Sequence, residues 1–446
     1  MNENRLPPQT KYIVGNEACE RFSFYGMRSL LVVYIASQLY PGGKDAEPFA
    51  KAVFHYFIAA TYLLPLLGAW IADRFWGRYK TILYISLMYC VGHGLLAATD
   101  LTSTLGAKRA VFFAGLACLA IGSGGIKPCV SAFAGDQFRG GREHLLPKIY
   151  GLFYWSINFG SFFAFIAIPE IMKHGGFAWA FGIPGIFMGI ATFIFWLGRH
   201  SYQHVPPSRH APPVDHATRT ADLATLGRIA LVFLPVSVFW SLFDQTGSTW
   251  IQQGEHMTPM SIPLGKWSWE LNVLNMQAVN ALFVMIFIPF FTYWLYPRLE
   301  RAGLKPTPLR RMGVGMVIGA LSFVVSAWLQ QRVDGGEKLS ILWQLAPYAV
   351  LTAGEVLLSA TGLEFAFTQA PPRLKSTIMS FWLLTVFLGN FLTGTITWLN
   401  AKLIGGSASG EMLFYAGLML VVAGIFAAIA RKFPDRTPQP EPVPQP

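Results

Sequence analysis

The sequence predicts an all-α integral membrane protein with twelve transmembrane helices in two six-helix bundles. Of its 446 residues, 53% are hydrophobic and only 13% are charged, whereas soluble domains carry about 25% charged residues. Apolar runs near the length that crosses about 30 Å of hydrocarbon recur along the chain. A polar connection, HSYQHVPPSRHAPPVDHATRTADL, divides these runs six and six.

Each apolar run is assigned to one spanning helix. The expected helices cover residues 14–40, 49–73, 79–99, 107–133, 145–170, 177–198, 223–251, 272–296, 310–331, 342–367, 374–401 and 411–432. They form an N-terminal bundle over 1–198 and a C-terminal bundle over 223–433, joined by a cytoplasmic linker over 199–222. The Pro-rich segment 434–446 is expected to be a disordered cytoplasmic tail.

The basic residues are distributed unequally between the two sets of loops. The loops on one side hold more than twice as many Lys and Arg residues as the loops on the other side. The positive-inside rule places the richer side, and both termini, in the cytoplasm. The net charge of +11 is therefore a topology signal and requires no nucleic-acid partner. The polar start MNENRLPPQTKY does not resemble a cleavable signal peptide. We expect a monomeric, multi-pass protein of the cell inner membrane, surrounded by lipid.

The sequence indicates no metal site and no cofactor. Its four cysteines fall in apolar segments, without the spacing of a disulfide framework or a metal site. The connection between the halves is rich in histidine, but its prolines and irregular spacing favour a solvated linker over a metal site. Its histidines are His200, His204, His210 and His216.

Ionisable residues within the apolar runs are costly in hydrocarbon, so they face a bundle interior and are usually functional. On the first helix, Glu17, Glu20, Arg21 and Arg28 fall within about 100° of one another at 100° per residue. Tyr25 lies at the edge of this face. A purely structural ion cluster would also be neutral, but an apolar face is often as stable. The charged face therefore favours a functional role.

Three later helices also carry ionisable groups. In GSGGIKPCVSAFAGDQF the glycines permit close helix packing, and Pro128 is expected to break the helix locally beside Lys127. The spacing is not that of a phosphate-binding loop. FWSLFDQTGSTW carries Asp244, and GEVLLSATGLEF carries Glu355 in mid-membrane and Glu364, which is either structural or functional.

The two halves are electrically unequal. Arginines and Lys127 lie on the first and fourth helices, whereas Asp244 and Glu355 lie on the seventh and tenth. A ligand with a carboxylate at one end and an ammonium at the other matches this dipole. Neutral hydrogen bonds between the two ends could come from Tyr25, Tyr62, Asn158 and Asn280.

These segments resemble the proton-coupled oligopeptide transporter family, a branch of the major facilitator superfamily. The family's first-helix signature, Glu-x-x-Glu-Arg-Phe-x-aromatic-Tyr-Gly, is matched over residues 17–26. GGIKPCVSAFAGDQF and GEVLLSATGLEFAFTQAP are similar to its other two hallmark regions, and LLGAWIADRFWGRYKT and FWSLFDQTGSTW also match. The resemblance spans residues 16 to about 395 and implies the major facilitator fold.

The resemblance implies cotransport of di- and tripeptides with protons by alternating access. It implies that Arg28 and Lys127 hold the peptide carboxylate, that Asn280 and Glu355 hold the amino group, and that protonation weakens a Glu20–Lys127 interaction. The implied substrate-binding residues are Tyr25, Arg28, Tyr62, Lys127, Asn158, Asn280, Glu355 and Trp382. The implied proton-coupling residues are Glu17, Glu20, Arg21, His55 and Glu355.

The chain departs from the family pattern in two places. Many bacterial relatives insert two helices between the halves, and the linker here is too short for them. The segment FHYFIAATYLLP resembles animal members and places His55 where they carry a histidine implicated in proton coupling. A lone membrane histidine is otherwise more often structural. Animal members pair an arginine matching Arg228 with an aspartate on the eighth helix, where this chain has Thr292. The partner of Arg228, and the extracellular gate formed there, are thus left open.

Other classes of protein fit less well. An enzyme would need a nucleophile, a base and an orienting group, or a cofactor motif. A channel would not need acids and bases from both halves to close on one ligand, and a sensor would need a signalling domain. A family member carrying nitrate or another small anion remains the alternative, although it would not need Glu355 to hold an ammonium.

Overall fold

The computed structural model describes residues 6–43, 45–138, 145–207, 216–264, 267–304, 306–369, 375–403 and 406–433. Within these ranges, the side chains at 146, 147, 216–218, 264, 267, 360, 363, 364, 366–369, 375, 376 and 400–403 are not described. The expected tail over 434–446, His210 and the side chains of His216 and Glu364 therefore lie outside the described part of the chain.

The chain is almost entirely helical. The first half holds α1 (Thr10–Tyr34), α2 (Ala46–Ile71), α3 (Gly77–Ala98), α4 (Leu105–Asp136) and α5 (Leu146–Leu197). The second half holds α6 (His216–Phe233), α7 (Val236–Phe243), α8 (Thr249–Glu255), α9 (Val273–Pro289), α10 (Tyr296–Arg301), α11 (Pro308–Asp334), α12 (Leu345–Gln369), α13 (Lys375–Leu403) and α14 (Ala408–Ala430). Strands β1 (Met260–Leu264) and β2 (Trp267–Leu271) pair antiparallel, with Ile262 opposite Trp269.

The expected spans can be traced through these elements. Eight helical stretches of the described chain are long and apolar enough to cross a membrane. Two of them, 46–101 and 148–200, contain two expected spans each, separated at Gly77 and Gly176, whose φ angles of 75° suit a residue without Cβ. The charged α1 and the bent pair Arg219–Phe233 and Val236–Glu255 supply the remaining two.

Two expectations about helix continuity were wrong. Helix α4 continues through Pro128 without interruption, because close packing at its glycines supports it: a Cβ at Gly124 would lie 2.5 Å from Leu64 Cβ. The seventh expected span is broken instead. Its halves are bent by 41° next to Pro235, which cannot donate a helical hydrogen bond, and a 3-10 turn follows at Asp244–Gly247.

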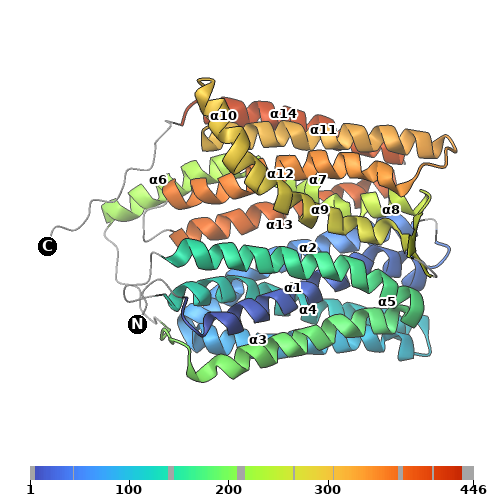
Figure 1. Ribbon diagram of the computed structural model, residues 1–446, viewed down its shortest axis with the longest axis horizontal. Coiled ribbons are helices and arrows are strands. Elements are labelled where there is room, and N and C mark those ends of the chain that lie inside the picture. The colour runs from blue at the N-terminus through green and yellow to red at the C-terminus, as the bar shows by residue number, and fades with distance from the viewer. Residues whose placement is uncertain are drawn as a thin grey trace.

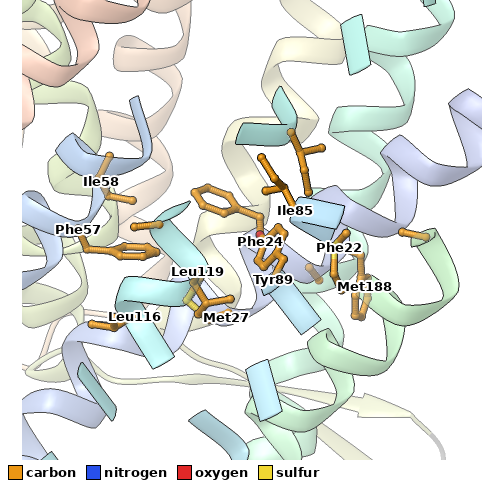
Figure 2. Packing of buried hydrophobic residues seen from close by; sticks show 14 of the residues in the cluster. Phe22, Phe24, Met27, Phe57, Ile58, Ile85, Tyr89, Leu116, Leu119 and Met188 are labelled. Carbon is orange, nitrogen blue, oxygen red and sulfur yellow. The ribbon is translucent and has the colours of Figure 1, made fainter. Parts of the chain in front are cut away.

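The long helices run roughly along the longest axis of the molecule, with the β1–β2 hairpin at one end and the start of α6 at the other (Figure 1). We call these the hairpin end and the linker end. One hydrophobic core is built mainly from α1–α5 and a second from α6–α14. Side chains of the first core, including Phe24, Met27 and Tyr89, interlock between neighbouring helices (Figure 2). The halves meet where α2 packs against α13 and α5 against α9.

Candidate functional site

The charged face of α1 folds into a compact ion cluster. Glu17 and Glu20 are each only 1% exposed. Arg21 Nε donates a hydrogen bond to Glu17 Oε1 at 2.6 Å and lies 3.1 Å from Glu20 Oε2. The second contact is an ion pair without hydrogen-bonding geometry, since neither Glu20 oxygen has a hydrogen-bond partner among the described residues. One guanidinium therefore contacts both carboxylates.

The predicted direct contact between Glu20 and Lys127 is not formed. The Lys127 ammonium lies 3.9 Å from the centre of the Phe24 ring and 4.7 Å from that of Tyr62. These aromatic faces attract a cation, but the ammonium has no hydrogen-bond partner in the part of the chain that the structure describes. Arg21, the neighbour of Glu20 on α1, is already paired with the Glu20 carboxylate and so competes with Lys127 for it. Among the described residues, the buried Lys127 ammonium thus has no carboxylate partner.

Arg28 is paired across the interface between the two bundles. Its Nη2 donates to Asp244 Oδ1 at 2.6 Å, and both side chains are buried. The other carboxylate oxygen of Asp244 accepts from Asn390 Nδ2, also at 2.6 Å. Asp244 therefore receives donors from α1 and from α13 and joins the two bundles.

His55 extends this network. Its Nδ1 lies 2.8 Å from Asn390 Oδ1, and its Nε2 lies 2.8 Å from Ser248 Oγ. Because Asn390 uses its amide nitrogen on Asp244, its oxygen must accept, so His55 Nδ1 carries a proton. In the neutral ring Nε2 then accepts from the Ser248 hydroxyl, and in the charged ring it donates to it. This histidine binds two groups of the opposite bundle in either charge state.

Further cross-bundle contacts lie in the half of the molecule nearest the hairpin. Buried Lys51 pairs with Glu411 on α14 at 2.6 Å. On the opposite flank, Asn275 donates to the backbone oxygen of Phe165 at 3.1 Å. The hairpin itself reaches α5 through an exposed Lys173–Glu270 pair and through Trp269, which donates to Glu170 at 3.0 Å. Together with the His55 network, these contacts close the bundles against each other at the hairpin end.

A central cavity of about 160 Å³ lies at the bundle interface. The predicted site residues that line it are Tyr25, Arg28, Tyr62, Asn158, Asn280 and Glu355. Typical ligand sites have volumes of about 300–1,000 Å³. The cavity is therefore contracted, and the bundles must separate before a peptide-sized ligand can enter.

The acidic wall of this cavity is held by hydrogen bonds. Asn280 Nδ2 donates to Glu355 Oε2 at 2.8 Å and lies 3.0 Å from Thr352 Oγ1. Asn158 instead donates to the Tyr154 backbone oxygen at 2.9 Å. Trp382 is not brought to the cavity, because its ring packs against Phe233 and Trp240 within the second core.

Sequence reasoning missed several residues of this network. Asp244 was noticed only as an acid of the second half, whereas it ties Arg28 to Asn390. Asn390 and Ser248 gave no signal, since a lone Asn or Ser in an apolar helix is common. Arg228 is exposed on α6, and Thr292 is also exposed. No ion pair of Arg228 occurs among the described residues, so the partner of Arg228 stays open.

A larger cavity of about 720 Å³ lies at the hairpin end, outside the closure. Its lining includes the charged residues Asp45, Glu47, Lys51, Asp334 and Glu411. None of the predicted site residues lines it. Size alone therefore does not mark the candidate site, which is the smaller chamber where opposite charges from the two bundles face each other.

Comparison of the sequence with known protein families supports the family resemblance predicted above. A family model described as the POT family matches residues 79–220 and 212–408. The chain belongs to the POT family. It is 36% identical over 367 residues to Peptide transporter family 1 of Drosophila melanogaster, and the aligned region covers 74% of this chain and 48% of the relative. It is 34% identical over 375 residues to human Solute carrier family 15 member 1, covering 72% of this chain and 52% of the relative. The chain thus spans about half the length of these two relatives.

Solved structures of the POT family share the whole fold. The crystal structure of an auto-inhibited POT family peptide transporter is 37% identical with a TM-score of 0.86, covering 98% of this chain and 99% of that one. The POT family transporter PepTSo, crystallised in meso, is 40% identical with a TM-score of 0.85, covering 96% and 98%. The predicted family and the predicted membrane fold are confirmed.

Proposed function

We propose that this protein imports di- and tripeptides together with protons, by alternating access between its two bundles. The observation that carries the proposal is the central cavity. Arg28 from α1 and Glu355 from α12 line the same chamber, and the cation of Lys127 lies behind Tyr62, another lining residue. A zwitterion with a carboxylate at one end and an ammonium at the other complements this polarity. Relatives and structural neighbours named as peptide transporters support the same substrate class.

The roles of the charged residues follow from their contacts. Since Arg28 is already bound to Asp244, Lys127 is the better candidate to receive the peptide carboxylate. Glu355, held by Asn280, would receive the amino group. Glu17, Glu20 and Arg21 would carry the coupling proton, and His55, also a predicted proton-coupling residue, would hold the bundles together through Asn390 and Ser248. Protons are then the coupling ion, and no cofactor takes part.

The proposal also fixes an orientation. By the positive-inside rule the basic loops favour a cytoplasmic linker end and cytoplasmic termini, and the protein would work in the cell inner membrane as a monomer. The hairpin end would then face outward, and the cross-bundle contacts would close the outward path. In this state the hairpin end is closed and the central cavity of about 160 Å³ is too small for a peptide, so the bundles would have to separate before a peptide enters or leaves.

Uptake of labelled dialanine into proteoliposomes tests the function. One elementary charge crossing 100 mV carries about 2.3 kcal/mol, so one proton could concentrate a neutral peptide about fifty-fold. We expect uptake to rise with outside acidity and with an inside-negative potential. Uptake that ignores both the pH gradient and the potential would contradict proton coupling. Accumulation of nitrate in place of dialanine would contradict the substrate class.

Lys127→Ala and Glu355→Ala should each lose recognition of one peptide terminus. The lysine variant should cease to distinguish a free from an amidated C-terminus, and the glutamate variant should cease to distinguish a free from an acetylated N-terminus. Truncating one member of a buried charged pair costs about 2–5 kcal/mol, which is about 30-fold or more in affinity. Competition binding is the cleaner measurement, because it does not depend on proton coupling.

Each terminus variant serves as the control for the other. A matched neutral control is Trp343→Phe, since Trp343 packs edge-on against Trp328 and does not line the central cavity. This control should keep both discriminations. If both alanine variants weaken modified and unmodified peptides by equal factors, the proposed polarity is wrong.

A further inference from the structure

Among the buried polar atoms near Glu20 are two hydroxyls, those of Tyr89 and Ser123, that have no part in the roles described so far. Both Glu20 oxygens, the Tyr89 hydroxyl, the Ser123 hydroxyl and the Lys127 ammonium lack a hydrogen-bond partner among the described residues. Glu20 is 1% exposed, and Tyr89 and Ser123 are both 0% exposed. Leaving a buried polar group unpaired is costly, so this concentration of unpaired groups on three neighbouring helices needs an explanation.

These groups are neighbours and not scattered through the core. The Tyr89 hydroxyl on α3 has Glu20 on α1 and Ser123 on α4 as its polar neighbours. Ser123 and Lys127 lie one turn apart on α4 and so share a face. The order across the helices is therefore carboxylate, tyrosine hydroxyl, serine hydroxyl and ammonium. It spans the gap left by the missing Glu20–Lys127 contact.

The position of Tyr89 is fixed by its surroundings. Its ring stacks on His93 with centroids 5.2 Å apart, and His93 Nε2 lies 2.8 Å from Ser23 Oγ on α1. At Gly122 the helices approach so closely that a Cβ would lie 2.6 Å from Tyr89 Cβ. Figure 2 shows Tyr89 in the same packed group as Phe22, Phe24 and Ile85.

We propose that Tyr89 and Ser123 form a hydroxyl bridge between Glu20 and Lys127 and position the Glu20 carboxyl for proton binding. This inference deepens the proposed function and rests on it. When Glu20 is ionised, the Tyr89 hydroxyl donates to its carboxylate and the Ser123 hydroxyl donates to the Tyr89 oxygen. When Glu20 binds a proton, its own O–H donates to the Tyr89 oxygen, and Tyr89 donates to Ser123. No proton leaves the hydroxyls, and only the direction of the hydrogen bonds reverses.

Among the described residues, few charged or titratable groups lie around Glu20, so loss of the bridge should change the pH profile of driven uptake measurably. They are Glu17 and Arg21 on α1, Tyr89 and His93 on α3, and Lys127 on α4 with Tyr62 of α2 behind it. Helix α5 packs on this part of α1 through Gly160 and Phe187, which do not titrate. Removing the tyrosine hydroxyl therefore removes one of the few donors that can reach the carboxylate.

Tyr89→Phe deletes the hydroxyl and keeps the ring. Losing a donor to the ionised carboxylate favours its protonated form, so the pH of half-maximal driven uptake should move upward by about one unit or more. Peptide counterflow without a proton gradient should keep its KM. Ser123→Ala should shift the profile in the same direction by less, because it acts on Glu20 through Tyr89. The control Tyr34→Phe removes an equally buried hydroxyl that donates to Asp100, and its profile should not move.

Infrared spectroscopy gives a readout that does not depend on transport. The carbonyl stretch of protonated Glu20 is the band that disappears in Glu20→Gln. It should move to higher frequency in Tyr89→Phe, because a hydrogen-bond partner has been lost, and stay in place in Tyr34→Phe. An unshifted band together with an unshifted pH profile in both Tyr89→Phe and Ser123→Ala overturns the bridge. If the unsubstituted protein shows no acid-driven uptake, the proposed function fails, while the infrared band still decides the bridge.

Discussion

Glu20→Gln should abolish proton-driven accumulation of peptide and leave peptide-for-peptide exchange intact. The amide keeps the shape of the carboxyl but cannot carry a proton, and the Arg21–Glu17 hydrogen bond of 2.6 Å remains to hold Arg21. Loss of one coupled proton at 100 mV removes about 2.3 kcal/mol of driving force, so accumulation should fall about fifty-fold. Uptake and counterflow measured in the same proteoliposomes separate the two activities.

The matched control for this variant is Glu170→Gln. Glu170 is a carboxylate of α5 that accepts from Trp269 at the hairpin end, away from the Glu17–Glu20–Arg21 cluster. The Glu170→Gln variant should accumulate peptide as the unsubstituted protein does. Full proton-driven accumulation by Glu20→Gln would show that another group carries the proton.

Asp244→Ala should open the bundles at the hairpin end. It leaves Arg28, 7% exposed, without its counter-ion and removes the acceptor for Asn390. Breaking a buried pair in this way costs about 3–5 kcal/mol, enough to shift a closed–open equilibrium more than about 100-fold. Distances between spin labels at Ser103 and Lys338, both exposed near the hairpin end, should lengthen, and driven uptake should be lost.

Two further variants test whether the buried Arg28–Asp244 pair, and not packing alone, keeps the hairpin end closed. Lys173→Ala removes an exposed pair with Glu270 that crosses the same interface at 2.6 Å, and such pairs are worth about 0–1 kcal/mol. It should leave the distances unchanged. Replacing Arg28 and Asp244 together by Met and Leu should restore most of the closed population, because removing both charges leaves none unpaired. If Asp244→Ala and Lys173→Ala lengthen the spin-label distances equally, the buried Arg28–Asp244 pair does not keep the bundles closed.

The sequence by itself determined the membrane fold and the family. Apolar runs of spanning length are required wherever a helix crosses hydrocarbon, so the helices of this chain could be placed approximately, except for the seventh, which is broken next to Pro235. The charged face of α1 could also be predicted from the sequence, because Glu17, Glu20 and Arg21 repeat at helical spacing. Charged side chains are costly in hydrocarbon, so these three were expected to form a buried cluster, as they do. Their pairing was not predicted: the resemblance implied a Glu20–Lys127 interaction, whereas Arg21 pairs with both Glu17 and Glu20.

Only the tertiary structure decided which charges meet between helices. Arg28 pairs with Asp244, 216 residues away, and Lys127 faces aromatic rings instead of Glu20. Asn390 and Ser248 enter the site only because α13 and the turn before α8 pack against His55. Helical periodicity fixes the face on which a side chain lies. The partner across an interface depends on the distance and rotation between helices, which are set by packing at positions such as Gly122 and Gly124.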